Sequence, residues 1–305
     1  MRFAIGIPQF YSDGEFDPAA FRADLARAEE LGYHSAWTQE QVLGSGPQLG
    51  AIETMTYAAA CTQRLRLGCA VLVSTLHSPV HLAKSLSTLD QLSQGRLEIG
   101  VGTGGQGRPF AAFGLDSGRY AARFSQGVAL MKALWTEPRV TFDGEFWQLE
   151  DAAMEPKPAQ KPYPPLWLGG SSPTALRRAV RIGTGFFGAG STPTARFAEQ
   201  VQVVREALAQ AGRPAGQFPV AKRVYLGLDS DAGRARQRMN AALEQLYGRR
   251  VPDIEAAAIA GTPAACVREL REVAAAGAEL ILFTALYEPA EHAERIAAEI
   301  IPQLG

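Results

Sequence analysis

The sequence predicts one α/β domain over residues 1–305, a (β/α)8 TIM barrel with a β-hairpin insertion after the fourth helix. Eight short runs of β-branched and apolar residues alternate with longer runs of helical period. Strands that alternate with helices pair in parallel through right-handed crossovers, and eight such units most often close into a barrel. A chain of 305 residues, 47% of them hydrophobic, suits one barrel. An open, doubly wound sheet is the alternative.

The elements follow one another in a regular order. The first strand, at residues 3–8, precedes a helix whose apolar face carries Phe21, Leu25, Ala28 and Leu31. The other strands are predicted at residues 34–38, 65–73, 97–101, 166–169, 185–188, 220–228 and 280–284. The helices after these strands are predicted at residues 50–62, 79–93, 119–136, 173–182, 194–211, 230–247 together with 263–276, and 290–303.

Two segments interrupt the alternation after the fourth helix. Asp143 and Gly144 form a typical hairpin turn, and the apolar residues on both sides suit two short strands. We therefore predict a β-hairpin over residues 139–149. The proline-rich residues 155–165 then serve as a stiff connector into the fifth strand.

The composition excludes several classes of protein. The 30 basic and 31 acidic residues give a formal net charge of -1 without long runs of either sign, so no nucleic-acid partner is expected. No stretch of 18 apolar residues is present, which predicts no membrane span. The first residues do not resemble an export signal, so a cytoplasmic location is expected. The four histidines lack the spacing of metal ligands, and we expect no metal site.

A glycine-rich segment follows the fourth strand, where barrel enzymes place their sites. Residues 100–107 read Gly-Val-Gly-Thr-Gly-Gly-Gln-Gly and formally contain the GxGxxG pattern. A dinucleotide fingerprint should open a helix at once, but the next helix is expected only near Arg119. We therefore favour a backbone surface that a flat ring can approach closely over a dinucleotide fingerprint or a merely flexible loop.

The segment after the fifth strand predicts an anion site. Ser172 is a natural N-cap and Pro173 suits the first helical turn, so free backbone N–H groups and the positive end of the helix dipole face the barrel mouth. An ordinary capped helix that binds nothing is the alternative. Schiff-base chemistry is not expected, because Lys222 is the only lysine on a predicted strand and lies at its start, far from the mouth.

Together these segments resemble the bacterial-luciferase-like superfamily, whose members use reduced FMN or the deazaflavin coenzyme F420. The most specific match runs from residues 67–72 through the Ser-Pro of residues 78–79 to Leu-Asp-Gln-Leu-Ser-Gln-Gly-Arg at residues 89–96. This most specific match continues to the glycine-rich residues 100–104, and further matches lie at residues 119–135, 142–144, 156–162 and 167–170. The resemblance spans nearly the whole chain.

The resemblance implies positions for the cofactor. Its ring would lie over a turn at Ser74 and Thr75, where the family often has a cis non-prolyl peptide bond, with Thr103 and Gly104 beside it. Glu40 matches an acidic position that often contacts cofactor or substrate. The phosphate end would meet a set of four residues: Gly170, Ser171, Ser172 and Thr174.

Two departures bear on the reaction. Deazaflavin-dependent dehydrogenases of the group commonly have a His and a Glu where this chain has Gln41 and Gly105. Without that acid–base pair, and with a sugar-phosphate substrate in doubt, we expect a monooxygenase that uses reduced FMN and O₂ on a small organic substrate, with Gln41 and His77 as catalytic residues. Coenzyme F420-dependent hydride transfer is the first alternative, and a non-catalytic flavin-binding protein is the second.

Partners follow from the same interpretation. A flavin reductase is expected if FMN arrives already reduced. We also expect a homodimer, because residues 54–60 and 82–92 offer small and apolar helix faces beyond what one barrel layer needs. The alternative is that these faces only pack on the barrel.

Overall fold

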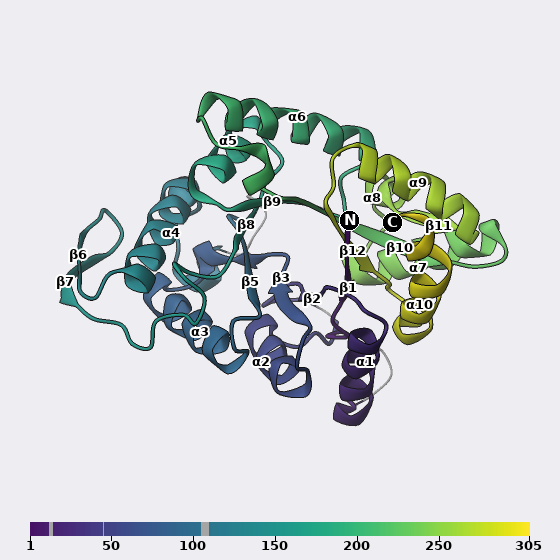
Figure 1. Cartoon of the computed structure of the whole chain (residues 1–305), viewed down its shortest axis with the longest axis horizontal. Helices are drawn as coiled ribbons and strands as arrows, with labels where there is room; N and C mark the ends of the chain where they lie inside the picture. Colours follow the sequence, from purple (N-terminus) through teal and green to yellow (C-terminus); the bar gives the residue numbers. More distant parts are fainter. Residues whose placement is uncertain (12–14, 45, 105–109) are drawn as a thin grey trace.

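The computed structural model describes residues 1–11, 15–44, 46–104 and 110–305 and confirms the predicted barrel. Every barrel strand pairs in parallel with its neighbours, and β12 pairs with β1 to close the ring (Figure 1). The barrel strands are β1 (Arg2–Gly6), β2 (Ser35–Thr38), β3 (Arg66–Cys69) with β4 (Leu72–Val73), β5 (Leu97–Gly102), β8 (Leu166–Gly169), β9 (Gly185–Gly188), β10 (Val220–Leu228) and β12 (Leu280–Thr284).

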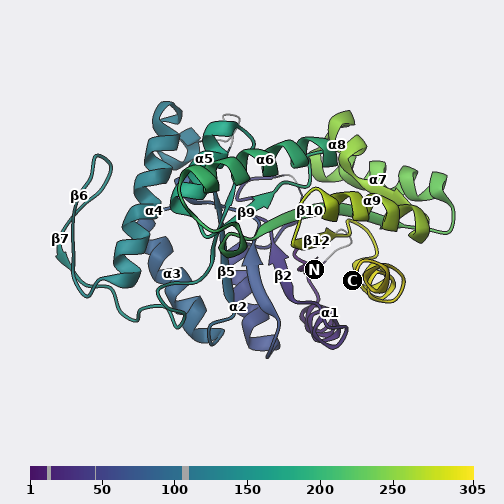
Figure 2. The ribbon, with the colours of Figure 1, turned by 45° about the horizontal axis from the view of Figure 1, so that its top comes forward.

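Helices form the outer layer around this ring (Figures 1 and 2). They are α1 (Pro18–Glu30), α2 (Ala51–Cys61), α3 (Pro79–Leu92), α4 (Tyr120–Thr136), α5 (Pro173–Ile182), α6 (Thr194–Gln210), α7 (Ala232–Tyr247), α8 (Pro252–Ala257), α9 (Pro263–Ala275) and α10 (Pro289–Arg295). Several of these helices begin with a proline that follows a capping residue. In α5, for example, Ser172 is the cap and Pro173 is the first helical residue. The last α-helix, predicted over residues 290–303, ends at Arg295 in the structure, and residues 296–300 continue it as a π-helix.

The strand predicted over residues 65–73 is divided. β3 ends at Cys69 and β4 begins at Leu72, and the Ala70–Val71 peptide bond between them is cis. The expectation of a cis bond in the turn at residues 73–75 was therefore wrong in position by three residues. Residues 74–76 instead form a short 3-10 helix.

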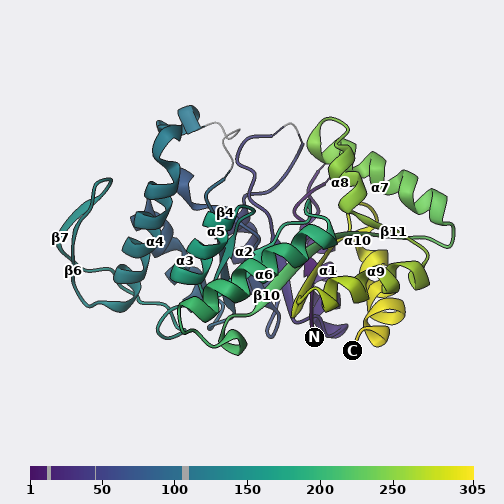
Figure 3. The same ribbon diagram turned by 90° about the horizontal axis from the view of Figure 1, so that it is seen from above.

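The insertion after α4 is an antiparallel pair, β6 (Val140–Asp143) with β7 (Gln148–Ala152). In all three ribbon views it extends away from the barrel beyond α4 (Figures 1, 2 and 3). It thus lies far from the ring of strands that carries the site.

One unit escaped prediction. α8 and the short strand β11 (Ile259–Gly261) follow α7, and β11 pairs with the end of β10 at residues 226–228, outside the barrel ring. β10 is long enough to pair with β11 as well as with its neighbours in the ring, because its first residues pair with β9 and β12 and its last residues with β11.

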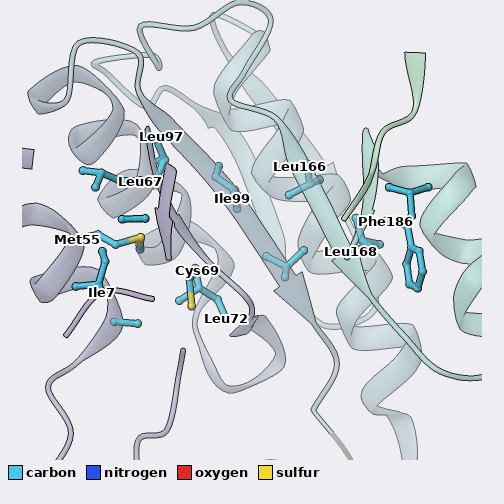
Figure 4. Packing of buried hydrophobic residues seen from close by; sticks show 14 of the residues in the cluster. Ile7, Met55, Leu67, Cys69, Leu72, Leu97, Ile99, Leu166, Leu168 and Phe186 are labelled. Carbon is cyan, nitrogen blue, oxygen red and sulfur yellow. The ribbon is translucent and has the colours of Figure 1, made fainter. Parts of the chain in front are cut away.

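The main core lies between the strands and the helices. Outward side chains of neighbouring strands, such as Leu67, Leu97 and Leu166, pack with helix residues such as Met55 (Figure 4). Both chain termini lie at the same end of the molecule (Figure 3). None of the helices in the described ranges is long and apolar enough to cross a bilayer.

Candidate active site

Aromatic side chains pack together in the lower part of the barrel interior. Trp37, Trp167 and Phe187 pack edge to face, with ring centroids 4.8–6.2 Å apart. Beneath them Glu98 accepts a 2.6 Å hydrogen bond from Trp167 Nε1 and pairs with Arg66 at 2.6 Å. Any site therefore lies above this layer, at the carboxyl ends of the strands.

Glycines open that upper layer around one valine. Val71 projects towards Gly100, Gly102 and Gly169. Its isopropyl group fits closely against them because these residues have no side chain. A Cβ on Gly102 would lie 2.8 Å from Val71 Cγ2, and one on Gly169 would lie 3.5 Å from Cγ1. Val71 is partly exposed. The result is a flat apolar surface at the mouth, formed by Val71 and strand backbone.

Glu40 and His77 form a hydrogen-bonded pair at the edge of this surface. His77 Nε2 lies 2.7 Å from Glu40 Oε1, while Glu40 Oε2 accepts a 2.5 Å hydrogen bond from the Val73 backbone N–H. The Glu40 side chain is 7% exposed and that of His77 is 27% exposed. A buried carboxylate therefore orients an imidazole that solvent or substrate can still reach.

The neighbouring residues at the ends of β4 and β5 are joined by hydrogen bonds. Thr75 Oγ1 donates to the Thr103 carbonyl at 2.8 Å, and Thr103 Oγ1 donates to the Gly104 carbonyl at 2.9 Å. Ser74 begins the short 3-10 helix beside them and is half-buried. Gly104 has a φ of 68°, a conformation that favours glycine. Gly105, expected to replace an acidic residue, lies outside the described residues.

The N-terminus of α5 is exposed at the same end of the barrel. Ser172 Oγ accepts a hydrogen bond from the Ala175 N–H, which confirms its role as N-cap. Ser171 and Thr174 are exposed. Gly170 must remain glycine, because a Cβ there would lie 2.8 Å from Ala175 Cβ. This helix end can therefore receive an anion.

A cavity of about 620 Å³ opens on the other side of the mouth, between the ends of β1, β2 and β12 and helix α7. Gln41 lines this cavity, whereas Glu40 and His77 do not. The residues that we predicted as one site thus fall into two adjoining regions: the surface around Val71 with the Glu40–His77 pair, and the cavity that contains Gln41.

Sequence reasoning missed Gln39 and Arg223. Arg223, on β10, donates from one terminal nitrogen to Gln39 Oε1 and from the other to Tyr225 Oη at 3.1 Å. Gln39 also lines the cavity. Gln39 directly follows β2, and Arg223 lies in the middle of β10 next to the outward-facing Lys222, so the alternation of side chains along a strand could have indicated that Arg223 points inward.

Lys222 requires a correction. Its side chain does not lie at the wrong end of the barrel but on the wrong face, where Nζ donates to the Arg223 carbonyl at 3.0 Å and lies 5.7 Å from the Phe197 ring of α6. Since this amine points away from the barrel interior, Schiff-base chemistry at the mouth stays excluded for it.

Comparisons with known proteins identify the family and agree with the barrel fold. Residues 1–298 match the family model of the luciferase-like monooxygenases. The chain belongs to this family, as the resemblance indicates. The expected luciferase-like oxidoreductase is thereby confirmed.

Two curated relatives are named F420-dependent glucose-6-phosphate dehydrogenase. The one from Kineococcus radiotolerans is 31% identical over 72% of this chain and 67% of its own length. The one from Nakamurella multipartita is 32% identical over 73% and 68%.

Solved structures show the same fold. A monooxygenase from Streptomyces bottropensis has a TM-score of 0.86 at 24% identity, with both chains fully covered. An F420-dependent secondary alcohol dehydrogenase, solved with an F420–acetone adduct, has a TM-score of 0.84 at 19% identity, covering all of both chains.

Proposed function

We propose that this chain is a coenzyme F420-dependent oxidoreductase that transfers a hydride to or from a small organic substrate. The Glu40–His77 pair is the observation that carries the proposal. The sequence alone favours reduced FMN and O₂, because Gln41 and Gly105 stand where an acid–base pair is expected. The contact between Glu40 and His77, which lie 37 positions apart, supports a different acid–base pair, and the names of the curated relatives support the same alternative.

The residues of the mouth fit a deazaflavin or a flavin. Its ring would lie on the surface around Val71, where Gly100, Gly102 and Gly169 keep the space that side chains would fill. The phosphate of the cofactor tail would meet the N-terminus of α5 at Gly170 and Ser171. When bound, coenzyme F420 supplies hydride chemistry that needs no oxygen.

His77 is the group that would move the proton. With Nε2–H donating to the Glu40 carboxylate, the neutral ring has its free lone pair on Nδ1. Nδ1 would accept the hydroxyl proton of a bound alcohol, and the bound cofactor would take the hydride from its carbon. Glu40 then stabilises the imidazolium, and the Val73 N–H holds the carboxylate in place.

The test is turnover without oxygen. A panel of secondary alcohols is supplied with oxidised coenzyme F420 under argon, and reduction of the cofactor is followed by absorbance. We expect product under argon in the wild type and a loss of kcat of about a hundredfold or more in His77→Gln, since general-base catalysis contributes on this scale. Product that forms only with reduced FMN and O₂ would contradict hydride transfer.

A further inference from the structure

The cavity that contains Gln39 and Gln41 shows a distinct charge pattern. Only two of the described residues that line it carry a formal charge, Arg238 and Glu288, and they pair with each other at 2.7 Å. The Arg238 guanidinium also stacks on Tyr287, 4.3 Å from its ring centroid. Among the described lining residues, no unpaired cation is thus available for a phosphate dianion, which needs one to offset its loss of hydration.

The walls of this cavity are largely apolar. Helix α7 contributes Ala241, Ala242 and Leu246, and the opposite side adds Ile7 and Leu286. Trp37 forms part of the floor. Such walls gain free energy by covering hydrocarbon. Polar side chains also line the cavity, but two of its glutamines, Gln9 and Gln48, already donate to the Gln39 carbonyl.

One polar group in this cavity is held in a fixed orientation. Arginine can only donate, so the atom of Gln39 that faces the Arg223 guanidinium must be the oxygen Oε1. Nε2 is consequently the free end of the amide, and none of the described residues accepts a hydrogen bond from it. A charge-assisted bond to Oε1 also polarises the amide and strengthens Nε2–H as a donor.

The backbone of Gln39 is fixed as well. The buried side chain of Gln9 accepts from the Gln39 N–H at 2.5 Å and donates to the Gln39 carbonyl at 2.9 Å. Gln48 Nε2 donates to the same carbonyl at 2.9 Å. Main chain and side chain of Gln39 are therefore both held before any substrate arrives, which lowers the entropy lost on binding.

We infer that the cavity takes an uncharged, mainly apolar alcohol or ketone, and that Gln39 Nε2–H binds its oxygen. This assignment rests on the proposed hydride transfer and names its substrate class. It separates the chain from the sugar-phosphate activity in the names of its curated relatives. Gln39 acts here as a specificity-determining residue, and Arg223 positions it.

The test uses the enzyme loaded with coenzyme F420 and measures binding of 2-octanone and glucose 6-phosphate by calorimetry. Gln39→Glu keeps the size of the side chain and a partner for Arg223 but removes the donor. Gln245→Glu makes the same change on exposed α7 at the cavity rim. We expect the affinity for 2-octanone to fall about tenfold in Gln39→Glu, and by less than about twofold in Gln245→Glu.

Three results would overturn the inference: tighter binding of glucose 6-phosphate than of 2-octanone, equal affinity of wild type and Gln39→Glu for 2-octanone, or no binding of 2-octanone by the wild type. Cofactor affinity is measured on the same samples. A protein that binds coenzyme F420 but not 2-octanone would contradict the substrate class alone. A protein that binds 2-octanone but not coenzyme F420 would instead contradict the proposed function.

Discussion

Lys222 is a buried amine whose protonation opposes folding. It is 2% exposed, and burial, with a smaller contribution from the charge of Arg223, lowers its pKa to about 7. In the unfolded chain the pKa returns to its ordinary value of 10.5. Between these two values only the unfolded state holds the proton, so the free energy of unfolding should rise with pH in this window.

We therefore expect the stability of the wild type, relative to Lys222→Met, to rise by about 1.4 kcal/mol per pH unit between pH 7 and 10. Urea unfolding of both proteins at several pH values measures this difference. The comparison removes groups that titrate equally in both proteins. Parallel pH dependence of wild type and variant would show that Lys222 keeps its proton in the folded protein.

At the scale of single residues, the sequence indicated several site residues but not which of them contact each other. Glu40 and His77 were each singled out, one by resemblance and one by its position after a strand, but no local pattern joins residues 37 positions apart. Their contact depends on how β2 and the β3–β4 segment lie side by side in the closed ring. Gln39 and Arg223, 184 positions apart, escaped for the same reason.

The break between β3 and β4 shapes the surface on which we propose that the cofactor ring lies. It turns Val71 towards the glycines of β5 and β8. Gly102→Ala would place a methyl group 2.8 Å from Val71 Cγ2, and a β-branched side chain has few rotamers to move into. We expect this variant to bind coenzyme F420 about tenfold more weakly while it still folds.

Fluorescence titration with coenzyme F420 measures the effect of Gly102→Ala. Gly261→Ala on β11 is the matched control, because its Cβ would meet Ala265 at an ordinary 3.6 Å. Unchanged affinity in Gly102→Ala would show that the cofactor does not rest on Val71.

Hydrophobic periodicity predicted most elements within one or two residues, since alternation and helical period follow directly from which face is buried. The break in β3–β4 could not be predicted in place, because residues 67–73 after Arg66 carry no polar side chain and a continuous strand fits equally well. The unit of α8 and β11 was hidden because short elements carry too few residues to show a period.

At the scale of the whole molecule, the outer faces of α2 and α3 remain our proposed dimer interface. A groove between them is lined by ten residues: Ile52, Glu53, Thr56, Tyr57, Ala60, Lys84, Ser85, Thr88, Leu89 and Leu92. Leu92 is 60% exposed at its edge. A single exposed leucine is ordinary on a protein surface, so the proposal rests on this groove together with the small and apolar residues of both helices.

We expect the wild type to be a homodimer by light scattering at micromolar concentration, and Leu92→Glu to shift it towards monomer because a buried carboxylate would lack a partner. Leu43→Glu, at a side chain of similar 57% exposure away from the groove, should leave the dimer intact. A monomeric wild type would contradict this interface.

Side-by-side titration of the purified protein with coenzyme F420, FMN and reduced FMN under argon tests the central claim most directly. We predict the tightest binding for coenzyme F420, and a loss of about tenfold in Ser171→Asp, whose carboxylate would repel the cofactor phosphate at the start of α5. Gln202→Glu adds the same charge on the exposed face of α6 and should change nothing. Tighter binding of reduced FMN would contradict the account and return the chain to oxygen chemistry.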